Sequence, residues 1–223
     1  MSDSQLRQDI VDELEFDPSF NGEHIGVVVD NNVVTLTGHV NSYAEKLAAI
    51  AAVQRIKGVH AIAESIEVRY PYQHKTADDQ IAKRASDIIN WDVHIPSSAV
   101  DVLVQDCGWV TLSGTVDWYY QRRAAEDDVR NLSGVRGVTN KIAIKPRVDS
   151  SNVKKIIESA LKRHAEVEAS AIRITVQNGN KVVLEGKVDD WDERRKVENA
   201  AWSTPGVASV EDRLTINYLE SDS

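Results

Sequence analysis

Thr111-Leu112-Ser113-Gly114-Thr115-Val116 is the stretch that decides the fold, because the chain contains it three times in related form. The other two copies are Thr35-Leu36-Thr37-Gly38-His39-Val40 and Val183-Leu184-Glu185-Gly186-Lys187-Val188. A second glycine, followed by valine, comes 20 residues after the glycine of each copy, at Gly58, Gly134 and Gly206. The first glycines lie 76 and 72 residues apart, so a unit of about 74 residues is repeated three times.

Three tandem domains are therefore expected, at residues 1–72, 73–147 and 148–223. The linkers between them are short, and they contain Pro71 and Pro146. Because domains of about 50 residues and more can form their own core, each unit is long enough to fold as one.

Within each unit the apolar pattern predicts helix, strand, strand, helix, strand. Apolar residues that alternate on both sides of an Asn, Asp or Gly turn indicate a β-hairpin. Before the hairpin of each copy, apolar residues recur every four positions, which indicates a first amphipathic helix. These residues are Leu6, Ile10, Leu14; Ile81, Ala85, Ile89; and Val153, Ile157, Leu161. The expected fold class is α+β, with a three-stranded sheet covered on one face by two helices. The strand order stays open.

The start of the second helix differs between copies. Ser42 with Glu45, and Asp190 with Glu193, have the spacing of a capping box. In the middle copy the cap position is Trp118, so either Asp117 caps one residue earlier or the helix begins less firmly.

Composition and charge limit the partners. Hydrophobic residues make up 42% of the chain and charged residues 27%, which is typical of a soluble globular protein. No window approaches the roughly 20 apolar residues of a membrane span. The sequence as it stands shows no signal peptide, which predicts a cytoplasmic protein, or a periplasmic one if a leader was removed. The net charge of −9 disfavours nucleic acid as a partner.

These features together resemble the BON domain of bacteria. The resemblance rests on the hairpin ending in Thr-Leu-Ser-Gly-x-Val, the Gly-Val 20 residues later and the final alternating strand, and it covers the chain three times. The resemblance implies a stress-related, transport-associated protein of the osmotically inducible type, which binds phospholipid surfaces or other ligands and has no catalytic motif. In this reading, the six repeated glycines are a structural signature.

The residues themselves also predict no enzyme, no cofactor and no metal site. The six histidines are scattered, and none has an equivalent in the other two copies. The chain lacks His-Glu-x-x-His, Cys-x-x-Cys and Gly-x-Ser-x-Gly motifs. The single cysteine, Cys107, excludes an intramolecular disulfide and lies in a predicted turn with no expected base beside it.

The middle copy has the most distinctive surface. Its second helix opens with Trp118, Tyr119 and Tyr120 and continues to Arg122 and Arg123. Aromatic rings suit the depth of lipid headgroups, and guanidinium groups suit phosphate. Trp118, Tyr120, Arg122 and Arg123 are therefore the candidate contact residues for an anionic membrane or a protein partner. The competing interpretation is structural, since Tyr119 aligns with Tyr43 and Trp191 as a packing residue at the helix start.

The charge distribution points to the same copy. Residues 1–72 carry 5 basic and 11 acidic side chains, whereas residues 73–148 carry 10 of each and residues 149–223 carry 11 and 14. We therefore expect a non-catalytic binding or scaffold protein that contacts anionic phospholipid through its middle unit. A protein–protein adaptor or self-assembling module is the alternative, and a small-ligand or ion sensor is a third. The oligomeric state is left open.

Overall fold

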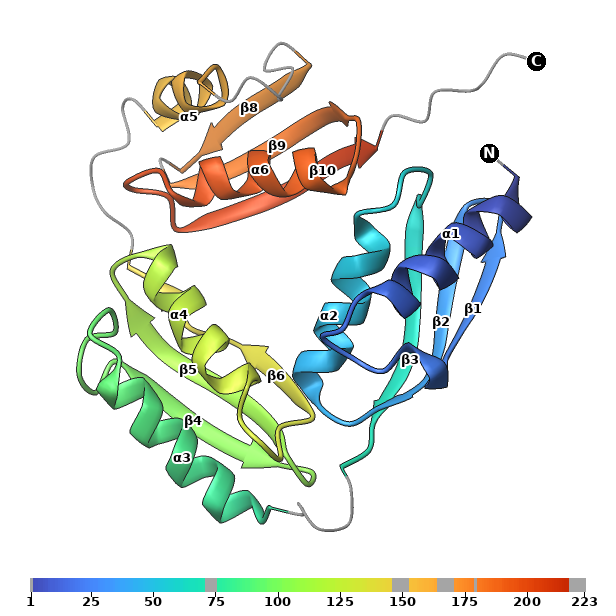
Figure 1. The fold of residues 1–223 in the computed structure, drawn as a ribbon. Helices are drawn as coiled ribbons and strands as arrows, with labels where there is room; N and C mark the ends of the chain where they lie inside the picture. Colours follow the sequence, from blue (N-terminus) through green and yellow to red (C-terminus); the bar gives the residue numbers. More distant parts are fainter. Residues whose placement is uncertain (1, 71–75, 146–152, 164–170, 179, 217–223) are drawn as a thin grey trace. The chain divides into compact units, whose positions relative to one another are not determined.

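The structure is a computed structural model that describes residues 2–70, 76–145, 153–163, 171–178 and 180–216. These residues form an α+β fold with three small sheets and six α-helices, as the sequence predicts (Figure 1). By its backbone contacts the chain divides into two compact units, residues 1–114 with 124–141 and residues 115–123 with 142–223. Across the described residues, the α-helices are all too short or too polar to cross a bilayer.

The first repeat shows the topology that the sequence left open. It contains α1 (Asp3–Phe16), β1 (Ile25–Asp30), β2 (Val33–Val40), α2 (Tyr43–Gln54) and β3 (Ala61–Val68), with a short 3-10 turn at Gly22–His24. The strand order is β1-β2-β3, with β1 antiparallel and β3 parallel to β2. The strand that carries the repeated glycine is therefore the central one.

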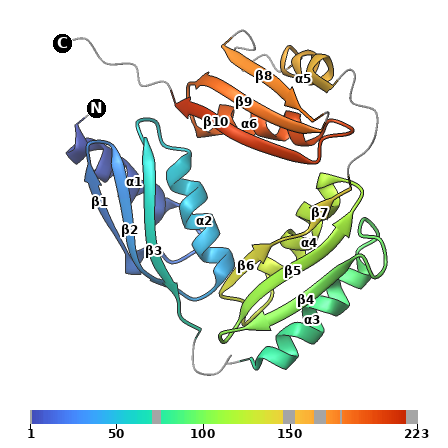
Figure 2. The same cartoon turned by 180° about the vertical axis from the view of Figure 1, so that it is seen from behind.

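One face of this sheet holds the core. The predicted stripe Leu6, Ile10 and Leu14 of α1 is buried against both α2 and the strands. Both helices lie on the same side of the sheet, which Figure 1 shows from the helix side and Figure 2 from the strand side. On the opposite face Val28 is 59% exposed, so the sheet is covered on one face only.

The repeated glycine is required by close packing of two chain segments. Gly38 has φ of +118°, and a Cβ atom there would lie 1.9 Å from the carbonyl oxygen of His24. The equivalent contacts of Gly114 with Ala99 and of Gly186 with Ala171 would be 2.1 and 2.2 Å. Because any side chain would collide with the backbone, these glycines report on the fold and not on binding.

The middle repeat departs from the others in its last strand. It contains α3 (Asp78–Trp91), β4 (Val100–Gln105), β5 (Trp109–Val116), α4 (Tyr119–Arg130), β6 (Gly137–Asn140) and β7 (Ala143–Ile144). Both β6 and β7 pair with β5 in parallel, so the third strand is present in two pieces. Between the pieces, the Lys141 N–H still donates to the Leu112 carbonyl over 2.7 Å, which keeps the chain along β5.

The third repeat has the same strand order as the first. It contains α5 (Val153–Leu161), β8 (Ile172–Gln177), β9 (Lys181–Val188), α6 (Trp191–Trp202) and β10 (Ser209–Ile216). The capping boxes predicted for the first and third repeats are confirmed. The N–H of Glu45 donates to Ser42 Oγ over 3.1 Å, and the N–H of Glu193 donates to Asp190 Oδ1 over 2.8 Å.

Candidate functional site

The candidate contact residues lie where β5 turns into α4 in the middle repeat. Gln121 organises this turn, since its side-chain oxygen accepts hydrogen bonds from the N–H groups of Asp117 and Trp118, each over 3.0 Å. Gln121 is buried and takes the place of the glutamate of a capping box. The carboxylate of Asp117 lies 3.5 Å from Lys145 Nζ, in an ion pair. The sequence left open whether Asp117 caps this helix or the helix begins less firmly, and the structure shows that Gln121, inside the helix, holds the turn.

The four candidate side chains are in different environments. Tyr120 is 54% exposed and Arg123 is also exposed, whereas Trp118 and Arg122 are half-buried. The guanidinium carbon of Arg122 lies 5.9 Å from the centre of the Trp202 ring, near the outer limit of a cation–π contact. Tyr120 and Arg123 are thus the pair best placed to meet a partner.

Trp202 is a residue of this site that the sequence did not reveal. It is the last residue of α6, and its ring stacks on Tyr119 with centroids 4.4 Å apart and planes within 11°. Tyr43 and Trp191, the residues aligned with Tyr119, pack against the cores of their own repeats, as the structural interpretation expects. Tyr119 makes a contact between the second and third repeats, at a helix position where Tyr43 also hydrogen-bonds to the next repeat, at Val138. No periodicity signals such a contact, because it joins distant parts of the chain.

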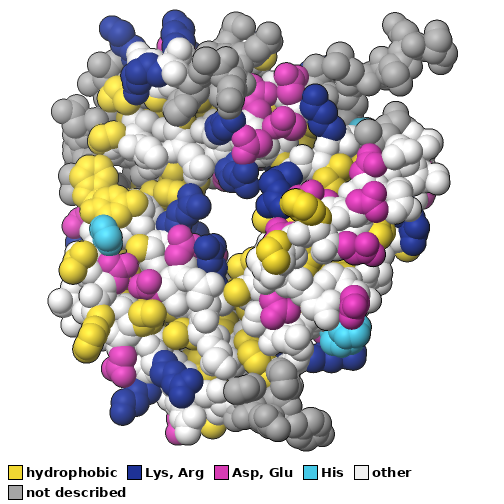
Figure 3. Space-filling view, viewed as in Figure 1, with side chains coloured by type: hydrophobic (Ala, Val, Ile, Leu, Met, Phe, Trp, Pro, Cys, Tyr) yellow, Lys and Arg dark blue, Asp and Glu magenta, His cyan; other side chains and the backbone are white. Residues whose placement is uncertain are grey.

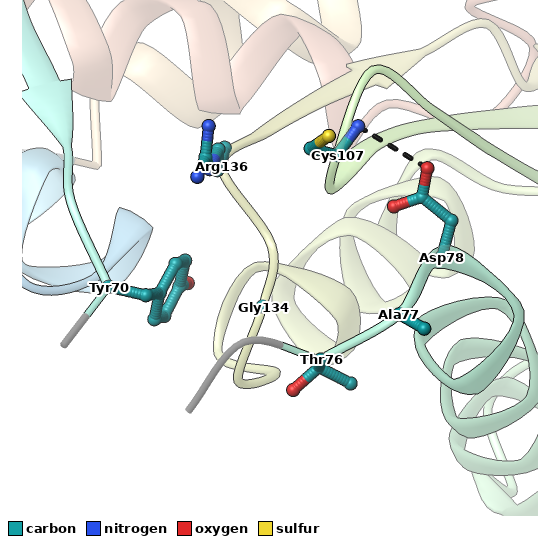
Figure 4. Close-up of a pocket in the computed structure, with 7 residues that line it drawn as sticks. All are labelled: Tyr70, Thr76, Ala77, Asp78, Cys107, Gly134 and Arg136. Atoms are coloured by element: carbon teal, nitrogen blue, oxygen red, sulfur yellow. Dashed lines mark hydrogen bonds between the residues drawn. The ribbon is translucent and has the colours of Figure 1, made fainter. Parts of the chain in front are cut away.

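A concave region, separate from the start of α4, lies beside the hairpin turn of the middle repeat (Figure 4). It has a volume of about 320 Å³ and is lined by Tyr70, Thr76, Ala77, Asp78, Cys107, Gly134 and Arg136. The Tyr70 hydroxyl donates to the Val135 carbonyl over 2.5 Å. Burial raises the pKa of Tyr70 above its ordinary value of 10.0, so the hydroxyl keeps its proton for this bond.

Asp78, a polar residue of this region, stabilises the fold by joining a helix to the hairpin turn. Asp78 Oδ2 accepts from the N–H of Cys107 over 3.3 Å, which ties the start of α3 to the turn. In the first repeat Asp3 accepts from the N–H groups of Asn31 and Asn32 in the same way, over 2.9 and 3.1 Å. A signal in the sequence was available, because Asp3 and Asp78 both precede the first buried helix position by three residues. Cys107 is exposed, as a turn residue should be.

Asp92, His94 and Asp128 form a small cluster of titratable groups elsewhere in the middle repeat. Asp92 Oδ1 lies 2.7 Å from His94 Nδ1, and hydrogen bonds from the His94 N–H and ring lower the pKa of Asp92 below 3.8. Burial, followed by the nearby Asp92 carboxylate, raises the pKa of Asp128 above 3.8. Among the described residues, no three His, Cys, Asp or Glu side chains are placed to hold a metal ion together. His74 and His164 lie outside the described residues.

Three copies of one αββαβ domain, alike in their cores and different on their surfaces, define a tandem-repeat protein of the α+β class. The chain belongs to the BON domain family, whose model matches residues 2–70, 77–146 and 149–218. This agrees with the resemblance that the repeated glycines carry.

A curated relative supports the same assignment. The chain is 30% identical to the Osmotically-inducible protein Y of Escherichia coli strain K12 over 154 residues, which are 65% of this chain and 74% of that protein. Among solved structures, two of the matches come from CdsD, a structural protein of the type III secretion system of Chlamydia trachomatis. The first covers 97% of this chain and 94% of the other at 16% identity and a TM-score of 0.28. The second, the C-terminal domain of CdsD, covers 98% and 100% at 15% identity and a TM-score of 0.27. Likeness at this level carries no argument about either fold or function.

Proposed function

We propose that this protein is a non-catalytic, stress-related binding protein whose middle repeat contacts anionic phospholipid surfaces. The observation that carries the proposal is the start of α4, where an exposed tyrosine and an exposed arginine stand next to the half-buried Trp118. Such a combination lets a ring reach headgroup depth while the guanidinium meets phosphate. The stress-related part rests on the similarity to the Osmotically-inducible protein Y.

The negative net charge of the molecule limits which repeat can contact an anionic membrane. Figure 3 shows acidic, basic and hydrophobic side chains interspersed on the face that it displays. The net charge is −9, so a membrane contact needs a local surface that escapes the general repulsion. The middle repeat supplies it, because its basic and acidic side chains are equal in number over residues 73–148.

Sedimentation with vesicles tests the lipid contact. We expect the full chain to pellet with phosphatidylglycerol vesicles at low salt, and to stay in the supernatant with phosphatidylcholine vesicles. Each unit of charge near an anionic surface contributes about 1 kcal/mol. Arg123→Glu changes the charge by two units, about 2 kcal/mol, and should therefore weaken binding roughly 30-fold. Arg84→Glu is the matched control, because Arg84 is an exposed arginine on α3 of the same repeat. Equal loss in both variants, or no sedimentation of the wild-type chain, would exclude this surface.

A protein–protein role is the second candidate, and a different observation favours it. Phe16 at the end of α1 and Trp91 at the end of α3 occupy equivalent positions and are 82% and 87% exposed. Both rings lie largely in solvent, and exposed aromatic side chains are common anchors of interfaces. Self-association of the wild-type chain in analytical ultracentrifugation, abolished in the double variant Phe16→Ser with Trp91→Ser, would favour this role. A monomer at all concentrations would count against self-assembly.

The proposal is compatible with two cellular compartments, the cytoplasm and the periplasm. A lipid contact needs access to a membrane surface, from the cytoplasm or from the periplasm. Fractionation of cells that produce the protein under osmotic stress separates these two locations.

A further inference from the structure

We propose that a cleft beside Trp109 and Arg136 binds an anion that carries a flat or ring-shaped body. The cleft has a volume of about 550 Å³ and lies between the end of β3 and the β4–β5 turn. Small-molecule sites have volumes of about 300–1,000 Å³ and combine an apolar wall with a few polar groups. This site is separate from the start of α4 and does not depend on the lipid proposal.

Trp109 forms the apolar wall. It is the first residue of β5 and pairs with Gly137 of β6, and a Cβ atom on Gly137 would lie 2.5 Å from its ring. The indole Nε1–H donates to Thr139 Oγ1 over 2.9 Å, which fixes the orientation of the ring. The side chain is nevertheless 47% exposed. One face therefore packs on the backbone of β6, and the other is available for stacking.

Arg136 supplies the positive charge. Its backbone N–H bonds to the Gly108 carbonyl over 2.8 Å, so the main chain beneath it is fixed. Among the described residues the structure records neither a hydrogen bond nor an ion pair for its guanidinium group, which is exposed. A planar guanidinium can bind a carboxylate or phosphate through two parallel hydrogen bonds. Arg136 is therefore ready to bind an anion.

The other charged side chains of the cleft are mostly engaged already. Lys46 Nζ lies 2.8 Å from Glu64, and the Arg69 guanidinium lies 2.6 Å from Glu67. Asp106 also lines the cleft and can accept a hydrogen bond from a hydroxyl group of the bound ring. Since Glu64 and Glu67 neutralise Lys46 and Arg69, Arg136 is the lining cation that remains to attract an anion.

The fold requires neither the Trp109 nor the Arg136 side chain, because the other two repeats have different residues at these positions. The strand position of Trp109 is Val33 in the first repeat and Lys181 in the third, opposite Ala61 and Ser209. The residue two after the helix-ending glycine is Arg136 in the middle repeat, and its equivalents are His60 and Ala208. The same scaffold thus folds without either group, so their joint presence needs another explanation. A ligand provides one.

NMR titration of the full chain tests the site. Two anionic ring compounds serve as probes for the two sources of this chemistry, adenosine monophosphate for a free nucleotide and glucuronate for an acidic sugar. Inorganic phosphate and adenosine are the controls for charge alone and ring alone. The indole N–H signal of Trp109, one of five tryptophans, is assigned by its loss in Trp109→Val. We expect at least one of the two anionic ring compounds to shift this signal and to bind about 10-fold more tightly than either control.

Two variants replace a cleft residue with the residue that occupies the equivalent position in another repeat, so the fold should tolerate each change. Trp109→Val takes the residue of the first repeat and Arg136→Ala that of the third, and each should weaken the binding probe about 10-fold. Trp91→Val and Arg84→Ala are the matched controls, since they remove an exposed tryptophan and an exposed arginine elsewhere in the middle repeat. The site is refuted if neither anionic ring compound binds, or if the two borrowed variants bind as tightly as the wild-type chain.

Discussion

Replacing the repeated glycine of the middle repeat by alanine should destabilise that repeat severely. Gly114 has φ of +129°, and a Cβ atom at this position would lie 2.1 Å from the Ala99 carbonyl oxygen and 3.1 Å from the Val100 Cα. Both of these atoms belong to the backbone that leads into β4. The collision therefore cannot be relieved by turning a side chain.

Two costs set the magnitude. Holding a non-glycine residue in this region of backbone space costs about 1–3 kcal/mol. Relieving the collision moves the start of β4 away from β5, which weakens ladder hydrogen bonds worth about 1 kcal/mol each. Gly114→Ala should thus lower the free energy of unfolding of the middle repeat by about 3–5 kcal/mol.

Urea denaturation followed by tryptophan fluorescence measures this loss. Three of the five tryptophans, Trp91, Trp109 and Trp118, lie in the middle repeat, and none lies in residues 1–72. Ser113→Ala, at the neighbouring position of β5, is the control and should change the midpoint little. A loss below about 1 kcal/mol in Gly114→Ala would show that the close approach does not require glycine.

Three further predictions concern polar groups. The raised pKa of Asp128 means that its stabilising contribution is fully present below pH 3.8, the ordinary value, and is lost as the pH rises through the folded-state pKa. Asp128→Asn should remove that part of the pH dependence in urea titrations, and an unchanged profile would refute the assignment. Gln121→Ala removes two hydrogen bonds to backbone N–H groups and should cost about 1–2 kcal/mol in the same assay, whereas Gln121→Glu should keep most of the stability. Asp3→Ala should accelerate hydrogen exchange at the amides of Asn31 and Asn32, and equal rates in both proteins would contradict the tie between α1 and the turn.

The sequence predicts those parts of the fold that rest on local chemistry. The helix stripe Leu6, Ile10 and Leu14 is buried as its period requires. Asn31 and Asn32 adopt φ of 48° and 62°, the left-handed conformation that a tight hairpin turn imposes. Each of these features is determined by residues close together in the chain, so a single sequence is enough to predict it.

Features that join distant residues could not be read in the same way. The parallel pairing of β2 with β3 depends on which edge of the hairpin meets the returning chain, and the apolar alternation is compatible with either edge. The stack of Tyr119 on Trp202 joins residues more than 80 positions apart. Gln121 gives no such signal, because a glutamine at the third helical position indicates a capping box only with a polar cap three residues before it, and that position is Trp118.

The placement of the last strand has a consequence for the order in which each repeat assembles. The hairpin of β1 and β2 closes across a turn of two residues, whereas Val33 pairs with Ala61, which leaves the ribosome 28 residues later. Until then the central strand keeps one edge of unpaired N–H and C=O groups, which is a template for pairing with another chain. A nascent chain passes through this exposed stage three times, once per repeat. An arrest of synthesis that leaves the hairpin outside the ribosome and the last strand of the repeat inside therefore prolongs the stage at which this edge can pair with another chain.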